Sequence, residues 1–139
     1  MIRFKKLDPA AKAPAYAHPG DAGMDFFALE RTVFKPGERK VVRTGIAMEI
    51  PEGYAGLIWD KGGISIREGL KSIGGVFDAG YRGEVLIGMI NLSSQEYVFE
   101  AGHKVAQMLI QKVEHCDIQE SKDLSSTKRG KGGFGSTGK

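Results

Sequence analysis

The sequence has only one cysteine, Cys116, among its 139 residues. A single thiol excludes an internal disulfide, so a reducing, cytoplasmic setting is the simplest expectation. No apolar run approaches the roughly 18 residues that a membrane helix needs, and the first ten residues lack the apolar stretch of a secretory signal. Neither a membrane protein nor a disulfide-stabilised secreted domain is expected.

Helical periodicity is also scarce, and the best case, residues 65–70, is long enough for about one turn. Strand-like alternation is clear over residues 42–50, and further β-like runs cover 2–7, 54–60, 84–92, 97–100 and 104–114. Glycine and proline turn signals separate these runs. The pattern predicts one all-β domain, a sandwich or a barrel.

The positive charge is not concentrated in a patch. The net charge is only +3, and Lys and Arg are spread along the chain, whereas nucleic-acid-binding proteins usually gather them in a stripe. The three histidines, His18, His103 and His115, do not have the spacing of a zinc site. Basic residues interleaved with 20 glycines fit a small polyanionic ligand, and no nucleic-acid partner is expected.

The composition changes near residue 121, which divides the chain into a β domain, residues 1–120, and a polar arm, residues 121–139. Such an arm cannot bury enough surface to order itself, and a solvated tail is one interpretation. The other is a nucleotide lid: Arg129 offers a fork to phosphate, Phe134 a face for a base, and the glycines with Ser136 and Thr137 offer donors. A lid would be disordered when empty and ordered by nucleotide.

A glycine-framed turn, Gly74–Gly83, places Asp78 and Tyr81 three residues apart. Asp78 is a candidate to orient or deprotonate a water, and Tyr81 to pack against a sugar. The alternative for Asp78 is the ordinary one, that its side chain caps a β-turn.

Three further sites carry weaker signals. Asp25, in Asp21-Ala-Gly-Met-Asp25, is a candidate for a hard cation, although turn aspartates explain the pattern nearly as well. Gln107 lies in a largely apolar run and needs polar partners, structural or ligand. Lys61-Gly62-Gly63 is similar to an anion-binding loop.

Taken in order, five stretches resemble the motifs of the trimeric dUTPase family. Ala22-Gly-Met-Asp25 matches the first, and Pro51–Gly56 leads into the second. Asp78–Gly83 matches the D-x-x-Y-x-G of the third, Lys104–Gln107 the fourth, and Arg129–Gly138 the glycine-rich fifth. The resemblance spans residues 21–138, and five motifs in the correct order are very hard to produce by chance.

The resemblance implies a jelly-roll-like all-β fold, a homotrimer with sites at subunit boundaries, and hydrolysis of dUTP to dUMP and pyrophosphate. That reaction keeps uracil out of DNA and supplies dUMP for dTMP synthesis. Asp78 would activate the water that attacks the α-phosphorus, and Tyr81 under the deoxyribose would exclude a 2′-hydroxyl. Backbone groups of the hairpin, at Ser72, Gly75 and Val76, would read the edge of uracil.

The phosphate end of the site is implied in the same way. Gln107 and the Lys61-Gly62-Gly63 loop would hold phosphates, and Asp25 would meet hydrated Mg²⁺, the expected cofactor. The arm of one subunit would close over a site built by its neighbours, with Phe134 on uracil and Arg129 on the terminal phosphate. The neighbouring Gly135 and Ser136 would contribute further substrate contacts.

The second motif departs from the family pattern, which usually reads Arg-Ser-Gly-Leu-Ala where this chain reads Lys61-Gly-Gly-Ile-Ser65. Lysine keeps the charge but loses the bidentate fork of arginine. Gly62 has no hydroxyl to donate, although backbone N–H groups can approach a phosphate closely there. The departure puts the phosphate contacts in question more than the reaction type.

The sequence leaves two other functions open. A dCTP deaminase shares the fold, but its catalytic glutamate, on the strand after the third motif, would fall at Gly88, and that strand, Val85–Leu92, contains no acid. A non-catalytic, dUTPase-like nucleotide-binding regulator is the second. Retention of Asp78 and Tyr81 argues against it, whereas the altered second motif keeps it open.

Overall fold

The structure, a computed structural model, describes residues 1–133 of the chain. The described part contains eleven strands and one short helix. In chain order they are β1 (Arg3–Lys6), β2 (Met24–Phe27), β3 (Thr32–Phe34), β4 (Arg39–Val42), β5 (Ile46–Glu49), β6 (Tyr54–Asp60), α1 (Gly62–Glu68), β7 (Leu70–Ile73), β8 (Val76–Asp78), β9 (Ile87–Asn91), β10 (Tyr97–Phe99) and β11 (Lys104–Lys112).

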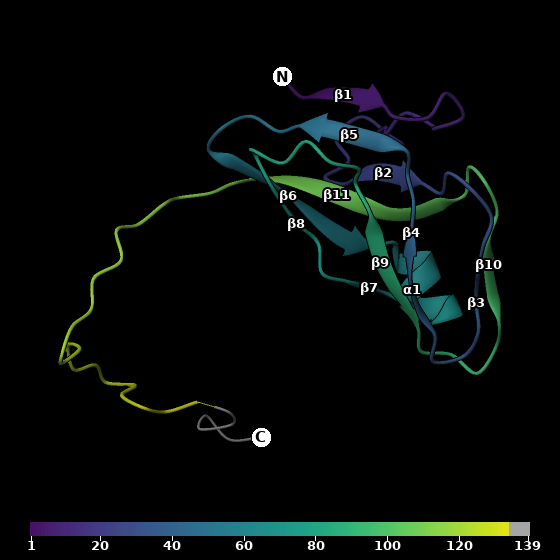
Figure 1. The fold of residues 1–139 in the computed structure, drawn as a ribbon. Coiled ribbons are helices and arrows are strands. Elements are labelled where there is room, and N and C mark those ends of the chain that lie inside the picture. Colours follow the sequence, from purple (N-terminus) through teal and green to yellow (C-terminus); the bar gives the residue numbers. More distant parts are fainter. Residues whose placement is uncertain (134–139) are drawn as a thin grey trace.

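The strands form two main sheets and two small ones (Figure 1). One main sheet has the order β2-β11-β6-β8 and the other β4-β9-β7, while β1 pairs with β5 and β10 with β3. Every pairing is antiparallel. The expected all-β, jelly-roll-like class is confirmed.

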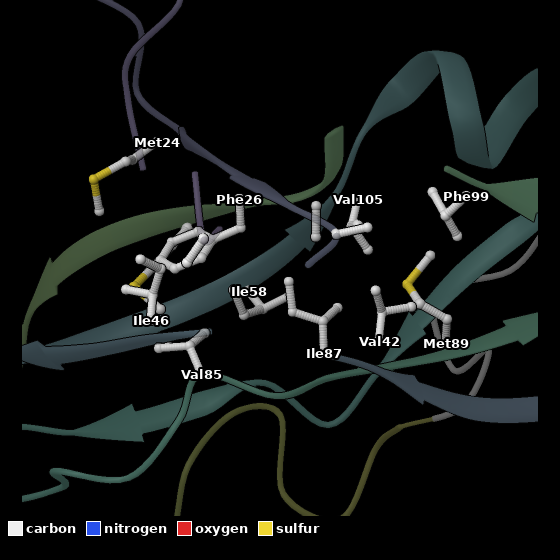
Figure 2. Packing of buried hydrophobic residues seen from close by; sticks show 14 of the residues in the cluster. Met24, Phe26, Val42, Ile46, Ile58, Val85, Ile87, Met89, Phe99 and Val105 are labelled. Atoms are coloured by element: carbon white, nitrogen blue, oxygen red, sulfur yellow. The ribbon is translucent and has the colours of Figure 1, made fainter. Parts of the chain in front are cut away.

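The core lies between the two main sheets (Figure 2). Each sheet turns its apolar side chains inward, because alternate residues of a strand point to opposite faces. The inward residues shown include Phe26, Ile58 and Val105 from the first sheet and Val42, Ile87 and Met89 from the second. This buried layer fixes the strand register, since a slip of one residue would turn every core side chain to solvent.

The expected strand over residues 42–50 is interrupted. Only its first residue, Val42, belongs to β4, and the run resumes as β5 at Ile46, with Gly45 between them at φ 66°. This left-handed conformation favours glycine and breaks the ladder, so β4 and β5 join different sheets. Strand β3 and most of β4 were not expected.

The helix begins earlier than the pattern indicated. Helix α1 covers Gly62–Glu68 rather than residues 65–70, with Lys61 as its N-cap and Gly69 in a left-handed C-cap. The glycine pair of the second motif therefore forms the first turn of this helix and not a free loop. Among residues 1–133, no helix has the length and apolar character to span a bilayer.

The chain leaves the sandwich after β11. Val113 still donates its N–H to the carbonyl of Gly53, at 2.9 Å, and the described residues beyond it extend away from the body (Figure 1). Arg129 donates to the carbonyl of Gly132 at 2.9 Å, so its guanidinium closes a local turn. The expected contacts of Phe134, Gly135 and Ser136 lie outside the described residues.

Candidate functional site

One group of the expected residues lies on the turn between β7 and β8. The expected hairpin over Ser72–Asp78 is wrong, because β7 pairs with β9 and β8 pairs with β6, in different sheets. Gly74 and Gly75 form the turn with φ of 76° and 121°, which only glycine adopts without strain. Gly75 also packs so closely on Ile58 that a Cβ would lie 3.0 Å from the Ile58 Cβ. Gly75 accepts a backbone hydrogen bond from Ile58 at 2.7 Å. The turn between β7 and β8 is therefore held rigidly, and the side chain of Val76, the first residue of β8, is exposed.

Asp78 ends β8 and begins the turn that leads to Tyr81. Its carbonyl accepts the Tyr81 N–H at 3.0 Å, so the backbone closes the β-turn. Its carboxylate is exposed and accepts no hydrogen bond from any of residues 1–133. The carboxylate does not serve as a turn cap, which leaves both oxygens available to a water.

Tyr81 is fixed on three sides. Its hydroxyl donates to the carbonyl of Glu84 at 3.0 Å, and its ring centre lies 5.9 Å from that of Phe77. The ring covers Gly83 so closely that any side chain there would collide with it. This contact explains the glycine of the D-x-x-Y-x-G motif. The side chain remains 44% exposed, and that surface is open to a ligand.

A hollow of about 440 Å³ lies beside this turn. It is open to solvent, and its lining includes Tyr54, Ala55, Val76, Asp78 and His115. Its volume is in the range of small-molecule sites. Asp78 and Glu52 are the two acids in its lining, and Asp78 is the one that lies on the turn with Tyr81.

A second group of expected residues lies on β2, β11 and the end of β6. Gln107 donates to the carbonyl of Asp60 at 2.8 Å and is paired with Asp25 across β2. The Gln107 amide occupies the space where a side chain at residue 23 would lie, so a larger residue in place of Gly23 of the first motif would displace this amide. Lys61 follows directly and donates to Asp25 at 2.6 Å. Motifs one, two and four therefore converge.

Asp25 is a buried carboxylate, 2% exposed, between two ammonium groups. Lys61 contacts Oδ1 at 2.6 Å, and Lys104 forms an ion pair with Oδ2 at 2.7 Å. Burial alone would raise the pKa of Asp25, but the contacts with Lys104 and Lys61 outweigh it and hold the pKa below its ordinary value. The acid is ionised at neutral pH.

This arrangement limits how Asp25 can meet a metal ion. Two ammonium groups beside the carboxylate disfavour a divalent cation at bonding distance. Oδ2 has no partner of hydrogen-bond geometry among the described residues, despite its ion pair. It can accept a hydrogen bond from a metal-bound water once Lys104, which is 45% exposed, turns aside. The residues fit a hydrated Mg²⁺ in this outer position only.

Asp60 connects the two groups and was not among the expected residues. Its Oδ1 accepts from both the N–H and the hydroxyl of Ser72, at 2.7 and 2.6 Å, and its Oδ2 pairs with Lys71. Burial would raise the pKa of Asp60, but the hydrogen bonds of Lys71 and Ser72 lower it overall. Both the hydroxyl and the N–H of Ser72 are therefore engaged within the protein, which leaves backbone groups further along the β7–β8 turn for a ligand.

The two groups lie far apart within one chain. Asp78 pairs with Ala55 of β6, whereas Gln107 pairs with Trp59, four residues further along the same strand. At a rise of about 3.3 Å per residue and a strand spacing of about 4.8 Å, the Asp78 and Gln107 backbones are roughly 16 Å apart. Asp25, one strand further, is roughly 19 Å from Asp78 by the same measure.

The comparisons with known proteins agree over almost the whole chain. A family model described as dUTPase matches residues 10–138. A deoxyuridine 5'-triphosphate nucleotidohydrolase of Thermobifida fusca is 45% identical over 140 residues, covering 99% of this chain and 78% of that protein. The protein of the same name from Clostridium tetani is 43% identical, covering 99% of this chain and 97% of its own length.

Solved structures give the same result. A mutant dUTPase of Staphylococcus bacteriophage 80alpha with dUpNHpp matches at a TM-score of 0.93 and 29% identity, covering 99% of this chain and 98% of that one. A mutant dUTPase from phage phi11 of S. aureus, described with a structural Mg(II) ion, matches at a TM-score of 0.85 and 27% identity, covering 91% and 99%.

Proposed function

Because the chain belongs to the dUTPase family, we propose that it hydrolyses dUTP to dUMP and pyrophosphate. The single observation within the structure that carries the proposal is the Asp78–Tyr81 turn, where an ionisable acid without a protein partner lies beside an exposed ring. A nucleotide substrate and an unpaired cysteine favour the cytoplasm as its location.

Asp78 is the proposed general base. Its free carboxylate can accept a proton from a water, and that water attacks the α-phosphorus. The new bond joins the water oxygen to phosphorus, and the bond from this phosphorus to the bridging oxygen breaks. The bond electrons leave with pyrophosphate, and the proton is held by Asp78 until it returns to solvent.

Tyr81 and the turn between β7 and β8 are the proposed specificity elements. The Tyr81 hydroxyl is already engaged with the protein, so the residue offers its ring and not a donor. A ring packed on the deoxyribose leaves no room for a 2′-hydroxyl. The rigid backbone between Ser72 and Asp78, including Gly75 and Val76, supplies fixed groups for the edge of uracil.

Gln107, Lys61 and the first turn of α1 at Gly62 and Gly63 are proposed to hold the phosphates. We propose Mg²⁺ as the cofactor, bound to the phosphate oxygens with Asp25 as acceptor for one of its water ligands. Mg²⁺ would neutralise charge on the triphosphate. The positive charge of Lys61 beside a helix start serves the same purpose without a metal.

We propose a homotrimer with a shared site, and the separation of the two groups supports this assembly. The Asp78 and Gln107 backbones of one chain are roughly 16 Å apart by strand geometry, a distance that their side chains would have to span to act on one phosphate. In the proposed site, the Asp78 turn of one subunit meets the Gln107 group of a neighbour. Cyclic assemblies use such contacts between unlike surfaces.

The arm is proposed to complete the site. Residues 114–131 are exposed and extend away from their own sandwich, a conformation suited to reach a neighbour (Figure 1). We assign Arg129 to the terminal phosphate and Phe134 to the uracil face, with Gly135 and Ser136 beside it. Closure of the arm would exclude bulk water from the reacting phosphate.

The deaminase alternative meets a steric obstacle. A Cβ at Gly88 would lie 2.9 Å from both the carbonyl oxygen and the Cγ1 of Ile73. A glutamate at this place on β9 would therefore require β7 to move. The test is to incubate dUTP, dCTP and dTTP separately with Mg²⁺ and measure pyrophosphate and ammonia. Pyrophosphate from dUTP alone supports the proposal; ammonia from dCTP, or binding without turnover, contradicts it.

A further inference from the structure

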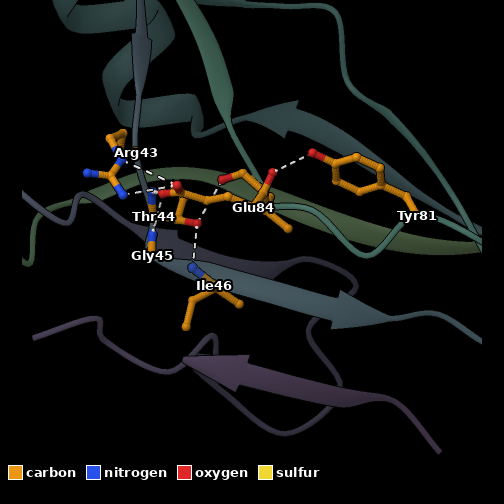
Figure 3. Close-up of polar contacts among 7 residues, drawn as sticks. Arg43, Thr44, Gly45, Ile46, Tyr81 and Glu84 are labelled. Carbon is orange, nitrogen blue, oxygen red and sulfur yellow. Dashed lines mark hydrogen bonds and ion pairs between the residues drawn. The ribbon is translucent and has the colours of Figure 1, made fainter. Parts of the chain in front are cut away.

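Glu84 follows the Asp78–Gly83 turn and attaches it to the connection between β4 and β5 (Figure 3). Its side chain is only 15% exposed. Oε1 accepts the backbone N–H groups of Thr44 and Gly45, at 3.1 and 2.7 Å. Oε2 accepts from the guanidinium of Arg43 at 3.1 Å. Both carboxylate oxygens are engaged, which fixes the side chain.

The backbone around Glu84 is held at the same place. Glu84 forms a β-bridge with Ala47, and Val85 donates its N–H to Ile46 at 2.7 Å. The buried hydroxyl of Thr44 donates to the carbonyl of Val85, also at 2.7 Å. The side-chain and backbone contacts of Glu84 thus attach one short segment to β5 and the turn before it.

This segment carries the acceptor that orients Tyr81. The Tyr81 hydroxyl donates to the carbonyl of Glu84 at 3.0 Å, as Figure 3 shows. The ring also packs over Gly83 and beside Phe77, and this hydrogen bond is the one polar contact of its side chain among residues 1–133. A shift of the Glu84 backbone would therefore rotate the exposed ring.

We propose that Glu84 is a positioning residue for Tyr81, and that its carboxylate sets the selectivity of the site for deoxyribose over ribose. The inference rests on the proposed function, in which Tyr81 packs on the sugar. Both carboxylate oxygens of Glu84 are engaged with residues 43–45, so the proposal assigns Glu84 no contact with the substrate. Its effect passes through the carbonyl that receives the Tyr81 hydroxyl.

Two substitutions separate this role from a general contribution to stability. Glu84→Gln keeps an oxygen for the amides of Thr44 and Gly45 and loses only the pair with Arg43. That pair is half-exposed at Arg43, so its loss costs little. Glu84→Ala leaves the amides of Thr44 and Gly45 without this acceptor. The segment that carries the Glu84 backbone carbonyl is then no longer held by these two hydrogen bonds.

The experiment measures kcat/KM for dUTP and for UTP in the presence of Mg²⁺. Glu84→Ala should lower the ratio of the two values by about ten-fold, the equivalent of a lost hydrogen bond. Glu84→Gln should restore most of the ratio, and Arg43→Ala, the matched control, should leave it near that of the unmodified protein. A folded Glu84→Ala protein with an unchanged ratio, or an equal loss in Glu84→Gln, overturns the inference.

Tyr81→Phe provides the second measurement and does not depend on the folding of Glu84→Ala. It removes only the hydroxyl that meets the Glu84 carbonyl, so it should lower the ratio to a similar extent. Combination with Glu84→Ala should then cause no further loss, because both changes break one linkage. An unaffected Tyr81→Phe protein contradicts the inference. Equal use of UTP and dUTP by the unmodified protein removes the Tyr81 assignment itself.

Discussion

Two inactive variants of this chain should restore activity when they are mixed in one assembly. The first is Asp78→Asn, which keeps the shape of the turn but cannot accept a proton from water. The second is Lys61→Ala combined with Gln107→Ala, which removes phosphate contacts but leaves the turn intact. The register of β6 separates these groups by roughly 16 Å at the backbone.

The size of the recovery follows from the arrangement. A shared site takes its turn from one chain and its phosphate group from a neighbour. In a random equal mixture, each contribution is intact with a chance of about one half, so about one quarter of the sites should be complete. If both groups came from one chain, no mixture of the two variants would contain a complete site.

The assay begins with the two variants, one of them tagged, mixed under mild denaturant and returned to native buffer. Pull-down of the untagged chain shows that mixed assemblies have formed, and pyrophosphate release from dUTP is then measured. A triple variant, with Asp78→Asn, Lys61→Ala and Gln107→Ala in one chain, mixed with Asp78→Asn is the matched control and should stay inactive. Mixed assemblies without activity would refute the shared site.

Four further results are expected. Asp78→Asn alone should abolish turnover while dUTP binding, measured by calorimetry, survives; near-normal turnover would return Asp78 to a turn residue. Truncation before Arg129 should leave the circular dichroism spectrum unchanged and nearly eliminate turnover. Phe134→Ala should cost about 1–3 kcal/mol of transition-state binding. Full activity without the arm would mean that the arm is a solvated tail. Gly62→Ser should fold normally, because a Cβ at Gly62 meets nothing within 4 Å, and should raise kcat/KM if a hydroxyl helps to hold phosphate. Asp25→Asn should lower the free energy of unfolding by about 1–2 kcal/mol at neutral pH, since the partly exposed lysines can return to water. Because the folded pKa of Asp25 is depressed, its contribution is present above the ordinary value of 3.8 and lost as pH falls below it, so urea titrations should show a weaker acid dependence in the variant.

Runs of apolar and β-branched residues bounded by turn signals identified β6 and β11, although neither buries every second residue. The clear alternation over residues 42–50 identified β5 but not the break before it. All four residues of β2 are buried, so the sequence there does not alternate. Strands β7 and β8 are short and join through two glycines, a composition that indicates only a turn.

The local structure around a candidate site residue could be predicted where a single short motif forms it. The glycine frame around Asp78 and Tyr81 indicated a tight turn, and the contacts of Gly75 and Gly83 give its physical reason. Asp60 and Glu84 could not be found in this way. Their partners are 12 and about 40 residues away in the sequence, so only the folded sheets bring them together.

Asp25 shows how the surroundings of a residue decide what a motif does. In the sequence, an aspartate with no basic residue close to it along the chain is a candidate metal ligand. In the fold, Lys61 at the start of α1 and Lys104 of β11 form ion pairs with its two oxygens. In the proposed site, the acid would hold these ammonium groups near the phosphates and accept a hydrogen bond from a metal-bound water. Neither lysine is close to Asp25 along the chain.

The separation of the two groups is a consequence of the core and not of surface details. Ile58 and Met108 are buried on facing strands, and their pairing fixes where Trp59, Gln107 and Ala55 fall along β6 and β11. A change of register that brought Asp78 nearer to Gln107 would expose this layer to water. The same register that buries this layer therefore keeps the two groups of one chain apart. In the proposed shared site, a second copy of the chain would supply the group that the first lacks, which ties the proposed activity to assembly.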